Sequence, residues 1–227
     1  MNLFGISALL AALGLDQRHA FQLALSQPLV TCSIIGFFSG NFADAMYFGL
    51  LIQLVWLGNL PVGASTTPEG NIASATGCLL YIEYNELFLP QSGFLILVIY
   101  LYTVFLSFIG GQLYNSARNL NIKLFDYAFK SINDSRRANI GKVIVVALLI
   151  QFGLNWIFII ISYFAGEQAL NQMHNLIPSG WKTIWSLAEW AIWGAGIGLV
   201  ISVYKSRKYK KLIAIVSILS VFIFKII

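Results

Sequence analysis

The second half of the chain contains apolar runs whose lengths suit membrane-spanning helices. The runs Phe94–Tyr114, Val143–Ala165 and Ile184–Tyr204 each hold about 20 residues, the number that an α-helix needs to cross the hydrocarbon core of a bilayer. A shorter run, Leu212–Ile227, ends the chain. The pattern therefore predicts regular spanning helices over residues 90–227, with a short last segment.

Residues 1–82 are also apolar, but no uninterrupted apolar run among them is long enough to cross a bilayer. Irregular backbone is tolerated at membrane depth only where protein buries it or where it lines a wet cavity. Short, interrupted segments are also the best sequence pointer to the binding site of a transporter. We therefore expect broken or re-entrant helices in this half, with ordinary kinked helices joined by loops as the alternative. The interrupting residues are Asp16, Pro28, Gly36, Gly40, Asp44, Gly58, Pro61, Gly63, Pro68 and Gly70.

Composition supports a lipid environment for the whole chain. Of its 227 residues, 58% are hydrophobic and 10% are charged, and the mean hydropathy is +0.77. Soluble domains carry about 25% charged residues, so this chain lacks the polar surface to face water on all sides. We predict an all-α, polytopic integral membrane protein with a single membrane domain over residues 1–227.

The positive charges gather in two segments. Six of the 14 Lys and Arg residues lie between Arg118 and Lys142, and five lie between Lys205 and Lys211. This distribution is typical of cytoplasmic connections, so we expect cytoplasmic basic loops near residues 115–142 and 205–211. The spacing of Phe125, Phe129 and Ile132 suggests an amphipathic helix at the cytoplasmic interface within the first of them. Nucleic-acid binding is disfavoured, because apolar spans flank both clusters and no binding-domain pattern accompanies them.

No catalytic or metal-binding pattern is present in the sequence. His19 and His174 are far apart, and no HExxH, Walker or nucleophile-elbow motif occurs. Cys32 and Cys78 lie in apolar surroundings without metal-ligand spacing, so we expect both to pack in the core. The sequence predicts no cofactor, no metal and no enzymatic activity of the chain by itself.

Four acidic residues in apolar surroundings are candidates for function, namely Asp16, Asp44, Glu69 and Glu189. A charged residue at the centre of a membrane helix costs about 2.5–3.5 kcal/mol on insertion scales, so such residues are retained for a reason. Asp16 and Asp44 suit helix caps. Glu189 lies among Trp residues, where a cavity, a partner subunit and the interfacial aromatic belt are equally good interpretations.

Glu69 stands in a polar, kinked passage that runs from Gln53 to Asn71. Trp56 offers a flat apolar face there, while Gln53, Glu69 and Asn71 offer hydrogen-bonding groups. Sugar recognition needs this mixture of directional hydrogen bonds and apolar surface. A buried loop whose side chains only satisfy freed backbone groups would use the same residue types, so both interpretations stay open. Asn59, Ser65, Thr66 and Thr67 add further polar side chains.

The same passage resembles a known family. QPLVTCSIIGFFSGN (Gln27–Asn41), followed by LLIQLVWLGNLPVGASTTPEGNIAS (Leu50–Ser74), is similar to the signature region of the IIC component of mannose/fructose/sorbose-family sugar phosphotransferase systems (PTS). LNQMHNLIP (Leu170–Pro178) resembles a later family connection more weakly. Gln53 matches the family's Gln or Glu, and Glu69 stands where the family usually has Asp.

The resemblance implies a multi-pass subunit of the bacterial inner membrane that binds and translocates a sugar, expected to be a hexose. Its implied partners are a IID membrane subunit and the cytoplasmic IIA and IIB components, with IIB phosphorylating the sugar. The substrate-binding residues expected on this basis are Gln53, Trp56, Glu69 and Asn71. A receptor or regulatory membrane protein that keeps the fold without transport is the alternative.

Overall fold

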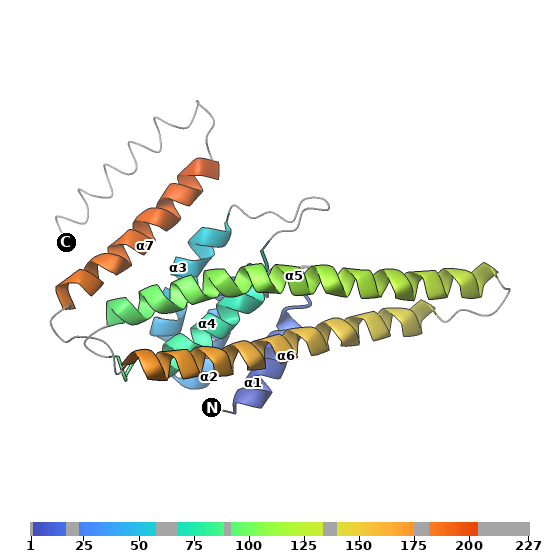
Figure 1. The fold of residues 1–227 in the computed structure, drawn as a ribbon, viewed down its shortest axis with the longest axis horizontal. Coiled ribbons are helices and arrows are strands. Elements are labelled where there is room, and N and C mark those ends of the chain that lie inside the picture. The colour runs from blue at the N-terminus through green and yellow to red at the C-terminus, as the bar shows by residue number, and fades with distance from the viewer. Residues whose placement is uncertain are drawn as a thin grey trace.

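The computed structural model describes residues 2–16, 23–57, 68–88, 92–133, 140–174 and 182–203, and these fold as α-helices with no strand among them (Figure 1). The prediction of an all-α membrane fold is confirmed. The helices of the described residues are α1 (Leu3–Leu13), α2 (Pro28–Ser39), α3 (Phe42–Trp56), α4 (Gly70–Tyr84), α5 (Ser92–Asn133), α6 (Ile140–His174) and α7 (Lys182–Val203).

The first half forms four short helices of 11 to 15 residues. At 1.5 Å per residue these are about 16–23 Å long, less than the roughly 30 Å of a hydrocarbon core. Pro28 begins α2, and Gly40 ends it in the left-handed conformation with φ +79°. Pro28, Gly40 and Gly70 thus lie at helix ends, whereas Gly36 and Asp44 lie inside α2 and α3. Gly58, Pro61 and Gly63 lie outside the described residues.

Small residues let α2 and α3 pack closely as a hairpin. A Cβ atom added to Gly36 would lie 2.6 Å from Cβ of Ala45, and one added to Gly49 would lie 2.8 Å from Cβ of Cys32. Each distance is too short for two carbon atoms, so only glycine permits this approach. The hairpin consequently places the first turn of α2 beside the last turns of α3.

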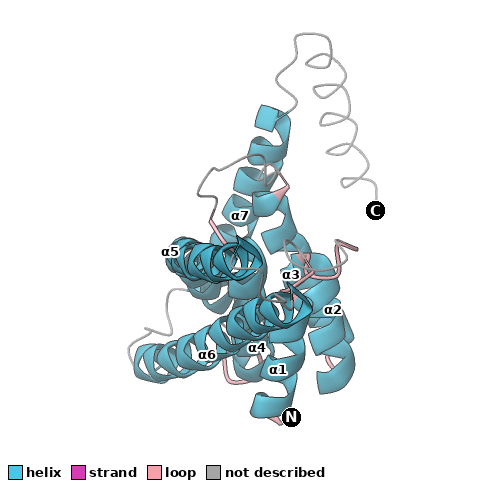
Figure 2. Ribbon diagram, turned by 90° about the vertical axis from the view of Figure 1, so that its right-hand side faces the viewer, coloured by secondary structure: helices cyan, strands magenta, loops and turns pink. Residues whose placement is uncertain are grey.

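The second half contains the two described helices that are long and apolar enough to cross a membrane, α5 and α6. They lie side by side (Figures 1 and 2), and both extend beyond the short helices in Figure 1. α5 and α6 contain the predicted spans that begin at Phe94 and Val143, and α7 follows the one that begins at Ile184 as far as Val203. The last predicted run, Leu212–Ile227, and the basic segment 205–211 lie outside the described residues.

The loop expected near residues 115–142 is helical over its first part, and the amphipathic segment expected within it is not a separate helix. α5 continues without a break to Asn133, so this segment is the second half of a 42-residue helix. The physical reason is that no Gly or Pro follows Gly111 within α5 to interrupt its hydrogen-bonded ladder. α6 likewise remains helical to His174, beyond the predicted run that ends at Ala165.

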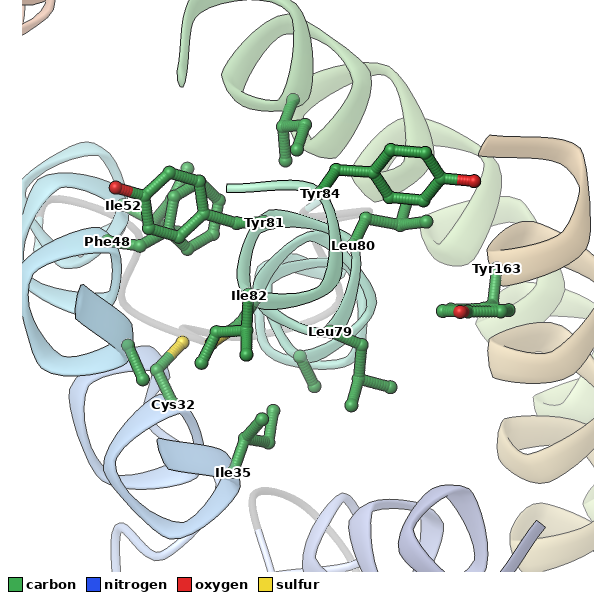
Figure 3. Close-up of a cluster of buried hydrophobic side chains, with 14 of the residues drawn as sticks. Cys32, Ile35, Phe48, Ile52, Leu79, Leu80, Tyr81, Ile82, Tyr84 and Tyr163 are labelled. Carbon is green, nitrogen blue, oxygen red and sulfur yellow. The ribbon is translucent and has the colours of Figure 1, made fainter. Parts of the chain in front are cut away.

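α4 is the central helix of the molecule. Of its 15 residues, 14 are buried, and only Glu83 is exposed. A helix that is apolar on all sides must be covered on all sides, and α2, α3, α5 and α6 surround it. Figure 3 shows its side chains pointing outward in every direction, with Cys32 of α2 and Tyr163 of α6 on opposite sides. Cys32 and Cys78 are buried free thiols, as predicted.

Candidate functional site

The four predicted site residues come from the end of α3 and the start of α4. Gln53 and Trp56 lie in the last turn of α3, Glu69 directly precedes α4, and Asn71 is its second residue. Trp56, Glu69 and Asn71 are buried, and Gln53 is partly buried. The fold therefore brings two helix ends and the predicted residues on them into one region.

Gln53 connects α3 to the first turn of α2. Its Oε1 accepts a hydrogen bond from the backbone N–H of Leu29 at 3.3 Å, and its Nε2 donates to Gln27 Oε1 at 3.0 Å. The N–H groups in the first turn of a helix have no partner within the helix, and Gln27, at the N-cap position, makes no side-chain cap. Gln53 thus supplies from α3 the acceptor that α2 lacks.

Trp56 lies against the first turn of α4. A Cβ atom at Gly70 would meet the indole ring at 2.5 to 2.8 Å, so the ring lies directly over that glycine. The indole Nε1 donates to Ser74 Oγ at 3.2 Å, and this hydroxyl donates to the carbonyl of Gly70. Trp56 therefore fixes the end of α3 to the start of α4.

Glu69 is a buried carboxylate at the N-terminus of the central helix, with 4% of its surface exposed. Its backbone N–H donates to the carbonyl of Ser107 in α5 at 2.8 Å, and Gly110 of α5 lies beside its side chain. The N-terminus of a helix carries a partial positive charge that favours an anion. α4 therefore stabilises a negative charge at this position.

Asn71 reaches toward the segment before α2, where its Nδ2 donates to Ser26 Oγ at 3.0 Å. That segment is held by Asp16, whose two carboxylate oxygens accept the backbone N–H groups of Leu23 and Leu25 at 2.8 Å each. From the sequence alone, Asp16 suits a helix cap. It instead fixes the stretch that carries Ser26.

Polar groups from three helix ends consequently meet in one place: the first turns of α2 and α4 and the last turn of α3. Analysis of the sequence did not single out Ser26 and Gln27, which complete the hydrogen-bonded pairs with Asn71 and Gln53. Their position directly before Pro28, at a helix start, was the available signal. The further polar candidates Asn59, Ser65, Thr66 and Thr67 lie outside the described residues.

The other two acidic candidates lie elsewhere. Asp44 is in the first turn of α3, where its Oδ2 accepts a hydrogen bond from Asn85 Nδ2. Nine residues separate it from Gln53, which corresponds to about 14 Å along a helix. Glu189 of α7 accepts a hydrogen bond from the Tyr47 hydroxyl, which also accepts one from Trp193 Nε1 at 3.1 Å. Both residues therefore connect helices away from the polar site.

Comparison with known proteins assigns the chain to a family. The family described as "PTS system sorbose-specific iic component" matches residues 1–226. The chain belongs to this family. The IIC component is the membrane subunit through which the sugar crosses, and phosphoryl transfer takes place on IIB. The chain is thus not an enzyme by itself.

Two solved structures share the fold. A chain described as "Structure of membrane protein" matches with TM-score 0.68 and 17% identity, over 97% of this chain and 85% of that one. A chain from the complex of the mannose transporter ManYZ with microcin E492 (MceA) matches with TM-score 0.54 and 17% identity, over 97% and 84%. A search of curated proteins gives no significant match.

Family membership also gives the setting of this IIC component. It is a multi-pass protein of the bacterial inner membrane, and it works with a IID membrane subunit and with IIA and IIB components. The predictions of family, general function and location are confirmed.

Proposed function

We propose that this IIC component binds a hexose at the polar site, with Gln53, Trp56, Glu69 and Asn71 as its sugar-binding residues, and presents it to IIB for phosphorylation. The observation that carries the proposal is the buried carboxylate of Glu69 at the start of the central helix. A buried ionisable residue in a membrane protein is costly, and such residues mark substrate pathways.

The surroundings of Glu69 suit a polyhydroxylated ligand. The first turns of α2 and α4 and the last turn of α3 bring amide and hydroxyl groups to the same region. A sugar hydroxyl both donates and accepts hydrogen bonds, so carboxylate, amide and hydroxyl side chains can all contact it. Irregular backbone between short helices is the arrangement in which transporters build their binding sites.

The hexose assignment follows from the sugars associated with similar proteins. The family description names sorbose, and the second structural match is a mannose transporter. Both sugars are hexoses, with six carbons and several hydroxyl groups. A site that presents several hydrogen-bonding side chains in a small region suits a ligand of this type.

Sugar uptake by cells that express this chain with its IIA, IIB and IID components, and that lack their own hexose transport, tests the proposal. Glu69→Gln keeps the shape of the side chain and removes its charge. A charge-assisted hydrogen bond contributes roughly 1.5–3 kcal/mol, so uptake affinity should fall about ten- to a hundredfold at unchanged membrane abundance.

Glu69→Asp restores the residue expected from the family resemblance and should retain much of the uptake. The proposal fails if Glu69→Gln lowers abundance but leaves uptake per molecule intact, because Glu69 would then be a structural carboxylate. Failure of the unmodified chain to transport any hexose of a broad panel, although correctly inserted, would favour a receptor or regulatory role.

A further inference from the structure

A buried polar pair lies on α6, and neither of its residues is among the site residues predicted from the sequence. Gln151 and Asn155 are 2% and 4% exposed, and they stand one helical turn apart within the apolar stretch Val143–Ile161 of α6. Gln151 Nε2 donates to Asn155 Oδ1 at 2.8 Å, and Asn155 Nδ2 donates to the carbonyl of Ala11 in α1 at 3.3 Å. The pair therefore faces the interior of the bundle.

One acceptor of this pair has no donor among the described residues. Gln151 Oε1 is buried and receives no hydrogen bond from the part of the chain that the structure describes. An amide oxygen without a partner is costly in an apolar interior. A ligand or water with an O–H or N–H group would remove this cost.

A second buried acceptor lies where no ligand can reach it. Thr103 Oγ1 also receives no hydrogen bond within the described residues. However, a Cβ atom added to Gly77 of α4 would lie only 2.1 Å from it. The Thr103 hydroxyl is pressed against the central helix, where a ligand has no room.

The surroundings of Asn155 connect the pair to the start of α4. A Cβ atom at Gly14, just after α1, would lie 2.2 Å from Cδ1 of Ile72 and 3.0 Å from Nδ2 of Asn155. Asn155 and Ile72 therefore both lie against the end of α1 at Gly14. Ile72 directly follows Asn71 in α4. The same three helices, α1, α4 and α6, lie close together in Figures 1 and 2.

The direction of α6 then places Gln151. Ile72 lies near Asn155, and the Tyr84 hydroxyl donates to Asn171 Oδ1, so α4 and α6 run in the same direction. Gln151 precedes Asn155 by one turn, about 6 Å, and thus lies toward the end at which α4 begins. Glu69 precedes α4 at that end.

We infer that Gln151 and Asn155 extend the sugar site onto α6, with Gln151 Oε1 accepting a hydrogen bond from one sugar hydroxyl. The inference rests on the proposed function of the site around Glu69. A sugar fits because it brings neutral O–H donors, and a neutral amide oxygen needs a donor without requiring a charge. A bound water would offer the same O–H chemistry, and the experiment distinguishes the two.

The test compares the transported hexose with its monodeoxy analogues, each of which lacks one hydroxyl. Uptake by the complete phosphotransferase system is measured as kcat/KM, normalised to membrane abundance. For the unmodified chain, kcat/KM should be about three- to tenfold lower with the analogue that lacks the hydroxyl bound by Gln151 than with the parent hexose, which is the effect of one neutral hydrogen bond.

Gln151→Met replaces the amide with an apolar group of similar size. Its kcat/KM for the parent hexose should be lower than that of the unmodified chain by a similar factor. Its kcat/KM for the analogue that lacks the hydroxyl bound by Gln151 should be no lower than for the parent hexose. Thr103→Val is the matched control, because it removes a buried hydroxyl pressed against α4, and its preference among the analogues should equal that of the unmodified chain. If Gln151→Met does not reach the membrane, Gln151→Asn is used instead, because its shorter side chain moves the amide oxygen away from the sugar by one methylene. It should likewise no longer distinguish the parent hexose from that analogue.

An unchanged preference among the analogues, or an equal loss with all of them, overturns the inference and assigns Gln151 to a bound water or to helix packing. Glu69→Gln is measured in parallel to separate the two proposals. If Glu69→Gln loses uptake while Gln151→Met keeps the normal preference, only the extension onto α6 fails. If Glu69→Gln transports normally, the proposed sugar site itself fails.

Discussion

Gln53 of α3 bonds the first turn of α2 through both ends of its side-chain amide, and one of these bonds is the 3.0 Å hydrogen bond from its Nε2 to Gln27 Oε1. Two residues from separate parts of the family-like region thus form one structural unit. Gln53 can contribute to transport directly, by contacting the sugar, or indirectly, by holding α2 in place.

The two roles of Gln53 predict different outcomes. Gln53→Met removes both hydrogen bonds, whereas Gln53→Glu keeps an acceptor for the Leu29 N–H and loses the donor to Gln27. Leaving a buried donor without a partner costs about 1–3 kcal/mol, so Gln53→Met should lower the melting temperature in detergent, and Gln53→Glu should lower it less. Reduced uptake affinity in both variants at normal abundance would show contact with the sugar, and equal stability of the two would contradict the capping role.

Asp16 offers a prediction about stability alone. Its carboxylate is 5% exposed and accepts two backbone N–H groups. Asp16→Asn retains one oxygen acceptor, loses the other and removes the charge, so we expect a loss of about 1.5–3 kcal/mol. Thermal unfolding of the purified complex measures this.

Asp126→Asn is the matched control for Asp16, because Asp126 is exposed on the second half of α5. It should leave the melting temperature within error of the unmodified protein. Equal melting temperatures for Asp16→Asn and the unmodified protein would show that Asp16 does not hold the segment before α2.

The central part of the site was predictable because its residues are unusual for a membrane chain. Glu69 and Gln53 stand out in an apolar sequence, and the structure places both at helix ends that meet. Ser26 and Gln27 do not stand out, because short polar residues before a proline are ordinary at helix starts. Their role depends on a tertiary contact between segments about 26 to 45 residues apart, and no local pattern reports such a contact.

Gln151 and α5 show two further limits of sequence reasoning. An uncharged amide within a long apolar run fits a lipid-facing, packed or ligand-binding position equally well, and only burial separates these possibilities. For α5, the change from apolar to polar residues near Asn115 predicts the end of a helix, but the helix continues to Asn133. Such a change shows that the environment of the side chains becomes polar. The end of a helix is marked by residues that interrupt or cap its backbone, such as Pro or Gly.

Tyr47 and Glu189 form a hydrogen bond between α3 and α7, so the effects of their variants on stability should not be additive. Tyr47→Phe and Glu189→Gln each disrupt the same hydrogen bond. Side-chain hydrogen bonds between membrane helices average about 0.6 kcal/mol and reach about 1.7 kcal/mol. The double variant should therefore be less destabilised than the sum of the two single variants by an amount in this range. A double-mutant cycle on unfolding in detergent measures the coupling, and strict additivity would contradict the connection.

The distribution of charge predicts the orientation of the chain. Eleven of the 14 Lys and Arg residues lie in residues 118–142 and 205–211, so we expect both regions to face the cytoplasm. Cysteines introduced at Ser131 and at Ser206 should not react with an impermeant thiol reagent added to intact cells, and should react once the membrane is opened. The native Cys32 and Cys78 are buried, and an unmodified chain measures any background from them.

A cysteine at the other end of the bundle gives the labelling test a position that should react from outside the cell. Glu86 is exposed and follows α4, whose last turn contacts α6 through the bond between Tyr84 and Asn171. Ser131 lies near the opposite end, in the last turn of α5, because α5 and α6 are antiparallel neighbours. A cysteine at Glu86 should therefore react in intact cells. Labelling of Ser131→Cys without labelling of Glu86→Cys would reverse the orientation and place the basic end of α5 outside the cell.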